Sequence, residues 1–167
     1  SIIPNLVSGN YDTIIAGMSI TAERDEVIDF TQNYTQPDPS AYMALSADVD
    51  LSGAVIAAQT NTIQANFVAA TGATLVEFAT PEETVSAVKN GEADAVLADK
   101  SYLTPVAESD ADLVLLAQQE LIGGGVGMGL RESDAELRDK FDAAIASMKS
   151  DGSLNALIAK WSVGEQF

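Results

Sequence analysis

The sequence contains no cysteine and no histidine, and each absence excludes a class of chemistry. Without cysteine there is no disulfide framework and no thiolate nucleophile, and without either residue there is no Cys/His zinc site. A Ser-His-Asp catalytic triad is excluded as well, because its general base is a histidine. The remaining chemistry belongs to carboxylates, lysine, tyrosine, hydroxyl groups and the backbone.

Basic residues are also scarce, with 8 Lys and Arg against 25 Asp and Glu in 167 residues and a formal net charge of −17. Nucleic acids and anionic membranes carry phosphate charge that repels such a chain, so neither is an expected partner. No apolar run approaches the roughly 18 residues that a membrane helix needs, and no charged-then-apolar signal segment opens the chain. Hydrophobic residues nevertheless make up 47% of the sequence, which predicts a globular chain with a core.

A short internal repeat organises the chain at an offset of 82 residues. In the segments Gly9–Gly17 and Gly91–Asp99, a glycine ends a helix, an aspartate follows three residues later, and a continuous apolar run comes next. Such runs are typical of strands buried on both faces, so both copies predict a helix that leads into a parallel strand. A Gly-x-x-Asp helix stop is also common in unrelated α/β proteins. Because ligands bind beyond the carboxyl ends of such strands, we expect half-sites at Gly17–Ser19 and Asp99 that face each other across a cleft.

The other predicted elements complete an α/β pattern. Strands are expected over residues 54–58, 74–78 and 113–117, and helices over residues 62–70 and 154–161. Two further helices are expected to begin at capping boxes, at Thr80–Glu83 and Ser133–Glu136. The glycine-rich residues 123–129 suit a crossover or a hinge.

Charge is unevenly distributed, and this predicts two lobes. Residues 44–125 carry 2 basic and 12 acidic residues, which sets them apart from both flanking blocks. We therefore expect residues 44–125 to form lobe 2, and residues 1–43 together with 126–167 to form lobe 1. The chain would cross between the lobes near residues 41–45 and 123–129.

The segment around Arg24 has the composition of an anion receptor. Thr21 can cap a short helix, Ser19 and the first helical amides can point toward an anion, and the guanidinium of Arg24 can pair bidentately with a carboxylate. Arg24 is the only basic residue among residues 1–43. The more ordinary interpretation is a surface arginine that balances its acidic neighbours, and it stays open here.

Three residues of lobe 2 are further candidates. Asp99 ends an apolar strand, where a carboxylate is costly unless a cation or hydrogen bonds match it. A ligand ammonium would do so, but Lys100, a loop amide or the capping of a following helix through Ser101 would serve equally well. Thr62 and Ile63 offer backbone amides at a helix start, which can hold an anion or can simply belong to an ordinary N-terminus.

No cofactor, metal site or catalytic residue is predicted. The glycine-rich run matches neither a Walker loop nor a dinucleotide fingerprint, because no Lys-Ser/Thr follows Gly129. The acidic pairs at residues 48/50, 82/83 and 110/112 lack the twelve-residue loop of a calcium site.

Four separated motifs carry a family resemblance. The segment Tyr11–Arg24, followed by residues 27–31 and Tyr34, closely resembles the signature of the bacterial extracellular solute-binding proteins of family 3, the polar amino-acid-binding components of ABC transporters. The segments Gln59–Thr62 and Gly91–Asp99 match as well, as do residues 127–131 with the following helix and its end at residues 151–152.

The resemblance implies an α/β chain with the two-lobed periplasmic-binding-protein fold (type II, Venus flytrap), lacking the N-terminal strand-helix-strand of the first lobe. It also implies roles for the candidate residues. Arg24 would grip the carboxylate of the ligand, helped by Ser19 and by the amides at the positions of Thr62 and Ile63. Asp99 and the carbonyl of Gly17 would hold the α-ammonium.

The implied function is that of a substrate-binding protein without enzymatic activity. It would capture a free L-amino acid by hinge closure and deliver it to the permease subunits of an ABC transporter, as a monomer in the periplasm. The signal peptide and the N-terminal segment of the family are not in this sequence. Two alternatives remain: an enzyme similar to the cyclohexadienyl dehydratases, with a cleft carboxylate as general acid, and the ligand-sensing domain of a membrane receptor. The sequence does not identify the amino acid.

Overall fold

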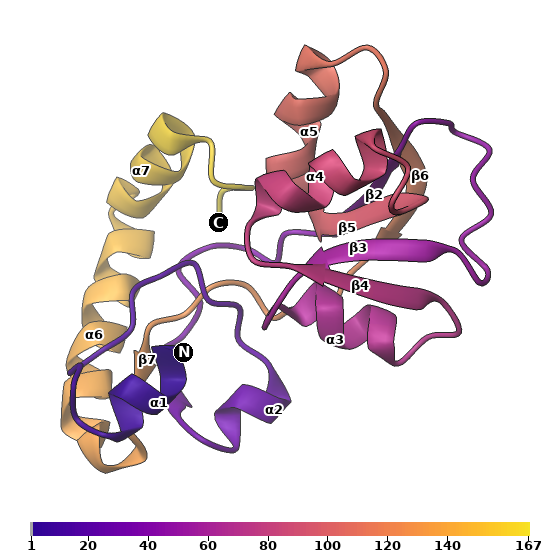
Figure 1. Ribbon diagram of the computed structural model, residues 1–167. Helices are drawn as coiled ribbons and strands as arrows, with labels where there is room; N and C mark the ends of the chain where they lie inside the picture. The colour runs from indigo at the N-terminus through magenta and orange to yellow at the C-terminus, as the bar shows by residue number, and fades with distance from the viewer. Residues whose placement is uncertain (1) are drawn as a thin grey trace. The chain divides into compact units, whose positions relative to one another are not determined.

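The computed structural model describes residues 2–167, which form two compact units (Figure 1). Unit 1 contains the residues up to Pro37 together with Gly123–Phe167, and unit 2 contains Asp38–Ile122. These borders differ from the expected ones at 43/44 and 125/126. The first differs because strand β2 (Ser40–Ala44) pairs with two strands of unit 2. The second differs because Gly124 and Gly125 hydrogen-bond to Ile20 of unit 1.

Unit 2 is built on a five-stranded sheet with the order β4-β3-β5-β2-β6. Strand β3 (Val55–Gln59) pairs in parallel with β4 (Thr74–Phe78) and β5 (Ala95–Asp99), whereas β2 lies antiparallel to β5 and to β6 (Val114–Glu120). Helix α3 (Ile63–Ala69) packs on one face through Val68, and α4 (Pro81–Lys89) and α5 (Lys100–Ser109) cover the other (Figure 1). The strands and helices expected for this region are therefore confirmed.

Local signals explain why unit 2 is predictable. The Thr80 hydroxyl accepts a hydrogen bond from the Glu83 amide, and the Glu83 carboxylate accepts one from the Thr80 amide, so the capping box is confirmed. Strand β5 has three consecutive buried residues, Ala95, Val96 and Leu97, as its apolar run predicts for a strand covered on both faces.

Unit 1 has little sheet and two small cores. Helix α1 (Ile2–Val7), helix α2 (Ala22–Asp25) and strand β1 (Asp29–Phe30) precede unit 2 in the chain. Strand β7 (Gly129–Leu130), the 3-10 turn η1 (Glu132–Asp134), helix α6 (Ala135–Ser150) and helix α7 (Ser153–Trp161) follow it. One core combines α6, α7 and β7, with Met128, Leu130, Ile145, Leu154 and Ile158 buried. The other joins α1 to the segment after it, with Leu6, Ile14, Met18 and Ile28 buried.

The first copy of the repeat does not form the expected parallel strand. Ile14 makes only an isolated antiparallel bridge to Gly129, with N···O distances of 2.8 and 3.0 Å. Ile14 is buried, but its neighbour Ile15 is 64% exposed, so this run is not covered on both faces. The physical reason is that the segment has one short partner in unit 1, whereas β5 lies between two strands of a sheet.

The expected capping box at Ser133–Glu136 is also wrong. Helix α6 begins at Ala135, after η1, and Asp134 at its N-cap makes no side-chain capping bond. The carboxylate of Asp134 instead forms an ion pair with Arg131 at 2.7 Å, and Ser133 donates its hydroxyl to Asp134. The ion pair with Arg131, three residues earlier in the chain, therefore takes the place of a capping bond from Asp134.

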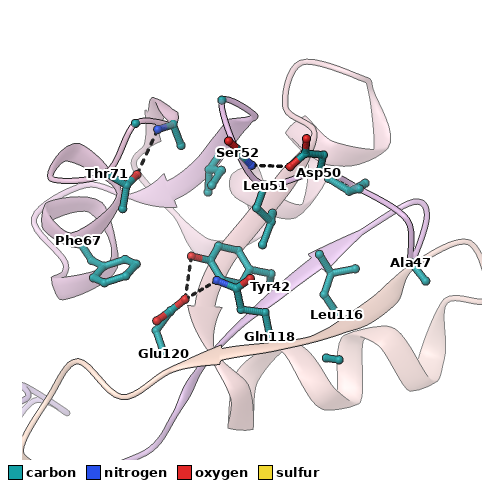
Figure 2. A pocket seen from close by; sticks show the side chains of 16 residues that line it. Tyr42, Ala47, Asp50, Leu51, Ser52, Phe67, Thr71, Leu116, Gln118 and Glu120 are labelled. Carbon is teal, nitrogen blue, oxygen red and sulfur yellow. Dashed lines mark hydrogen bonds between the residues drawn. The ribbon is translucent and has the colours of Figure 1, made fainter.

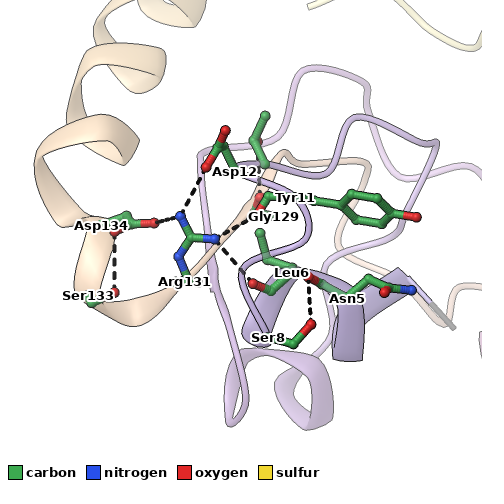
Figure 3. A network of polar contacts seen from close by, with 10 residues as sticks. Asn5, Leu6, Ser8, Tyr11, Asp12, Gly129, Arg131, Ser133 and Asp134 are labelled. Atoms are coloured by element: carbon green, nitrogen blue, oxygen red, sulfur yellow. Dashed lines mark hydrogen bonds and ion pairs between the residues drawn. The ribbon is translucent and has the colours of Figure 1, made fainter.

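Arg131 ties three segments of unit 1 together (Figure 3). Its Nη1 donates to the carbonyl of Leu6 at 3.2 Å and to the carbonyl of Tyr11 at 2.6 Å. Its Nη2 lies 2.7 Å from the carboxylate of Asp134 and 3.4 Å from that of Asp12. One guanidinium thus joins the end of α1, the segment after it and the turn before α6.

The glycine-rich run packs closely against two neighbouring segments. Gly125 has φ of +88°, and a Cβ atom there would lie 2.4 Å from the carbonyl of Thr35. A Cβ atom at Gly127 would lie 2.8 Å from the side chain of Ile20. Gly125 therefore needs glycine for close backbone approach, whereas at Gly127 the side chain of Ile20 would have to shift. The expected role as a hinge stays a prediction.

Over residues 2–167, helices are too short or too polar to cross a membrane.

Candidate functional site

Unit 1 places Gly17, Ser19 and Arg24 in one short stretch of chain that leads into α2. The Thr21 hydroxyl caps this helix by accepting a hydrogen bond from the Arg24 amide at 3.2 Å, as expected. The guanidinium of Arg24 folds back and donates through Nη1 to the carbonyl of Ser19 at 2.7 Å. Arg24 and Ser19 are therefore neighbours in space as well as in sequence.

Arg24 is half-buried, and burial lowers its pKa, while the charge of Glu23 raises it. An arginine keeps its proton in proteins despite such a shift, so the site retains a positive charge. The interaction with Glu23 is part of the ordinary interpretation of Arg24 as a balanced surface residue. That interpretation does not include the hydrogen bond from Arg24 to Ser19, which fixes the guanidinium against the backbone.

Gly17 and Ser19 are held from other parts of unit 1. Gly17 has φ of +60°, a conformation that favours glycine, and its backbone faces the hydroxyl of Tyr34, whose pKa burial raises and the Gly17 backbone lowers. Ser19 forms an isolated antiparallel bridge with Val126. The positions of the Ser19 and Gly17 backbones are thus fixed, and their contacts with a ligand stay predictions.

Unit 2 brings Thr62 and Asp99 to the rim of one cavity of about 270 Å³ at the carboxyl ends of β3 and β5. Its lining residues are Gln59, Thr62, Gln64, Pro81, Thr84, Leu97, Ala98, Asp99 and Tyr102. Thr62 caps α3 by accepting from the Ala65 amide at 3.2 Å, and it donates to the Gln59 carbonyl at 2.6 Å, so the expected helix begins one residue later, at Ile63. The side chain of Ile63 is buried and does not line the cavity, so only its amide is available for the expected role.

The donor that holds Asp99 is Gln64, and not Lys100, a loop amide or the Ser101 amide as its ordinary interpretations suggested. Asp99 Oδ1 accepts a hydrogen bond from Gln64 Nε2 at 2.7 Å. The Ser101 amide does not use Asp99 as a cap, because it donates to the carboxylate of Asp38 at 3.2 Å. Burial and the nearby charge of Asp38 raise the pKa of Asp99, while the hydrogen bond from Gln64 lowers it. A bound cation would relieve this unfavourable environment.

Gln64, Ser40 and Asp38 are the site residues that the sequence did not reveal. Gln64 is only 5% exposed and Ser40 is fully buried, although both are polar. The one local signal is that Gln64 stands between two apolar residues, Ile63 and Ala65, and both of these are buried in the structure.

A second and larger cavity of unit 2, about 800 Å³, lies between α3, the loop after β2 and strand β6 (Figure 2). Figure 2 shows Glu120 accepting hydrogen bonds from the Tyr42 hydroxyl, at 3.5 Å, and from Gln118, at 2.7 Å. Burial and the adjacent carboxylate of Glu120 raise the pKa of Tyr42 to about 12. None of the predicted site residues lines this cavity.

Comparison with known proteins decides the family. The sequence profile of the bacterial extracellular solute-binding proteins, family 3, matches residues 1–165. The chain belongs to this family. The expected fold class is confirmed, because the chain is mixed α/β and its structural relatives in the family are two-lobed periplasmic amino-acid-binding proteins.

One structural relative within the family shares more than two thirds of its aligned residues with this chain. A periplasmic His/Glu/Gln/Arg/opine family-binding protein from Silicibacter pomeroyi, solved in complex with lysine, is 69% identical. The superposition has a TM-score of 0.91 and covers 96% of this chain and 74% of that chain.

Two curated family members are more distant. The glutamine-binding protein GlnH of a Bacillus subtilis ABC transporter is 26% identical over 95% of this chain and 60% of its own length. The histidine-binding periplasmic protein of Salmonella typhimurium is 28% identical over 96% of this chain and 68% of its own length. The chain therefore spans about two thirds of these relatives or less.

Proposed function

We propose that this chain belongs to a receptor that binds a free L-amino acid and delivers it to the permease subunits of an ABC transporter. The observation that carries the proposal is Asp99, a solvent-accessible carboxylate at the rim of a cavity of amino-acid size, whose one hydrogen-bond donor within unit 2 is the neutral amide of Gln64. An α-ammonium would supply the positive charge that this carboxylate lacks. Family membership and the relatives that bind amino acids support the same function.

In this proposal the ligand carboxylate binds to unit 1. Arg24 supplies the charge, and the Ser19 segment that accepts its hydrogen bond supplies the neighbouring polar groups. Gly17 contributes its carbonyl to the α-ammonium, together with Asp99 of unit 2. The amides of Thr62 and Ile63 add donors for the carboxylate, as the family resemblance implies.

Basic amino acids are the first ligands to test. The relative that is 69% identical was solved with lysine. The cavity of unit 2 also lies in an acidic environment, because the charge of Asp38 acts on Asp99 and that of Glu82 acts on Tyr102. Such an environment attracts a ligand with a second ammonium group.

The remaining parts of the proposal concern the setting of the receptor. We place it in the periplasm as a monomer, with a hinge that closes on the ligand where the chain crosses between the units, near residues 37–38 and 122–123. The hinge expected at residues 41–45 is not kept, because residues 40–44 are buried in strand β2 between two strands of unit 2. Closure would be favoured because a ligand held from both sides binds the closed state better than the open one. The histidine-binding relative is periplasmic, which supports the location.

Thermal unfolding against single L-amino acids tests the proposal. A ligand present at 100 times its dissociation constant should stabilise the protein that contains this chain by about 2.7 kcal/mol. Lysine or arginine should raise the melting temperature of the wild type. Arg24→Ala should reduce that shift to about a third of its size or less, because it removes a charge-assisted contact worth about 2–5 kcal/mol.

Arg138→Ala is the matched control, since Arg138 pairs with Asp29 at the surface of unit 1 and has no role in the proposed site. This variant should keep the ligand-induced shift. If no amino acid changed the melting temperature and the protein turned over prephenate or arogenate, the function would be that of a dehydratase and not of a receptor. An equal shift in the Arg24→Ala variant would refute the assigned site.

A further inference from the structure

We propose that Gln64 is a positioning residue that holds the Asp99 carboxylate in place for the ligand ammonium. This inference rests on the proposed function for its binding consequence. Gln64 Nε2 donates to Asp99 Oδ1 at 2.7 Å and to Ser40 Oγ at 3.0 Å. An amide nitrogen carries two hydrogens, so both donors of Gln64 are used.

The three groups come from three different elements of unit 2. Gln64 lies in the first turn of α3, Ser40 begins β2, and Asp99 ends β5. Ser40 and Asp99 are direct register partners in the antiparallel β2–β5 pair. Gln64 is 5% exposed and Ser40 is fully buried, so packing restricts the amide and sets the position of the carboxylate.

The orientation of the Gln64 amide follows from its partners. A reversed amide would place its oxygen against Asp99 Oδ1, and two acceptors repel each other. Within unit 2, no other donor reaches the Asp99 carboxylate, so Oδ2 is the oxygen that the ligand can use.

A neutral donor suits this task better than a cation. Gln64 orients Asp99 without neutralising it, so the carboxylate keeps its charge for the ammonium of the ligand. The adjacent Lys100 is directed elsewhere, because its Nζ donates to Gln119 Oε1 at 3.4 Å. The other charged group that acts on Asp99 is Asp38, which raises the pKa of Asp99, and Gln64 opposes this by lowering that pKa. Gln64 thus keeps Asp99 ionised to lower pH.

Gln64→Met tests the proposal, because methionine has a similar length and no donor. The carboxyl carbon of Asp99, followed by NMR in the ligand-free protein, should titrate at higher pH in this variant than in the wild type. The affinity for L-lysine, measured by calorimetry, should fall about tenfold at neutral pH, since a hydrogen bond to a charged group is lost. The acid limb of the affinity profile should also move to higher pH, because an ammonium needs the ionised carboxylate.

Gln118→Met is the matched control, since Gln118 also donates its amide to a carboxylate, that of Glu120, but lines the other cavity. It should leave the pKa of Asp99 and the lysine profile unchanged. An unchanged Asp99 pKa in Gln64→Met would overturn the inference, even if the melting temperature fell. If Gln64→Met does not fold, Ser40→Ala replaces it, with a smaller rise in the same pKa expected. If the wild type binds no amino acid, the proposed function fails and the ligand-free titration still decides on Gln64.

Discussion

Replacing Arg131 by methionine should destabilise unit 1 more than any replacement of an exposed cation. The guanidinium donates to the carbonyls of Leu6 and Tyr11 and pairs with Asp134, while only 24% of its side chain is exposed. Methionine keeps the length and much of the packing of the side chain but removes the charge and all donors. The variant therefore isolates the polar contacts.

The magnitude follows from the contacts. Each hydrogen bond from a charged donor contributes about 1.5–3 kcal/mol, and the lower value applies where water can reach the carbonyl that is left behind. The pair with Asp134, which is 25% exposed, adds up to about 1 kcal/mol, and the pair with Asp12, which is 90% exposed, adds nothing measurable. We expect Arg131→Met to lower the free energy of unfolding by about 3–4 kcal/mol.

Urea unfolding followed by tryptophan fluorescence measures this loss, because the only tryptophan, Trp161, lies in unit 1. Lys140→Met is the control, since Lys140 forms an exposed pair with Glu136 one helix turn away. That variant should lose less than about 0.5 kcal/mol. Equal midpoints and slopes for the two variants would refute the role given to Arg131.

Three further predictions concern unit 2. Asp99→Asn should weaken lysine binding about thirtyfold or more at neutral pH, from a contact worth at least about 2 kcal/mol, as calorimetry would show. The folded-state pKa of Asp99 is raised above 3.8, so the wild type loses stability as the pH rises above that value and the carboxylate ionises. Asp99→Asn has no such group, and its melting temperature without ligand should therefore rise relative to that of the wild type over this pH range. Thr80→Ala should cost about 1 kcal/mol in urea unfolding, because it removes the cap of α4; an unchanged midpoint would contradict this. In a titration followed by tyrosinate absorbance, Tyr42→Phe should lack the step at about pH 12. The wild type should lose stability between pH 10 and 12, because in this range the tyrosine ionises more readily in the unfolded state than in the folded state.

Sequence reasoning worked best where the signal was local. Each feature of the α4–β5 segment depends on residues that are close together in the sequence. These features are the capping box at Thr80 and the buried run Ala95–Leu97, and both were predicted. The same reasoning failed for the first copy of the repeat, around Ile14. Whether an apolar run becomes a strand depends on the partners beside it, and the pattern of the run contains no information about them.

The candidate site divides in the same way. The caps at Thr21 and Thr62 were predictable from short spacings, and the place of Asp99 at the end of a strand was predictable from the apolar run before it. The binding role of Asp99 stays a prediction. The role of Gln64 was not, since its partners Ser40 and Asp99 lie 24 and 35 residues away in the sequence. A glutamine in a helix turn has no sequence signature that distinguishes such contacts from exposure to solvent.

The division of the chain into units has a consequence for the order of events during synthesis. Unit 2 is one uninterrupted stretch, so all its strands have been synthesised once Ile122 is added. Unit 1 begins earlier in the chain but cannot complete its contacts until unit 2 has been synthesised. Leu6 is 125 residues away from its partner Arg131, and the partner of Ile14 is Gly129. Contacts between such distant residues form late in folding. The segment around α1 therefore lacks its contacts with residues 129–131 throughout the synthesis of unit 2, and only the packing of Leu6, Ile14, Met18 and Ile28 against one another can form before then.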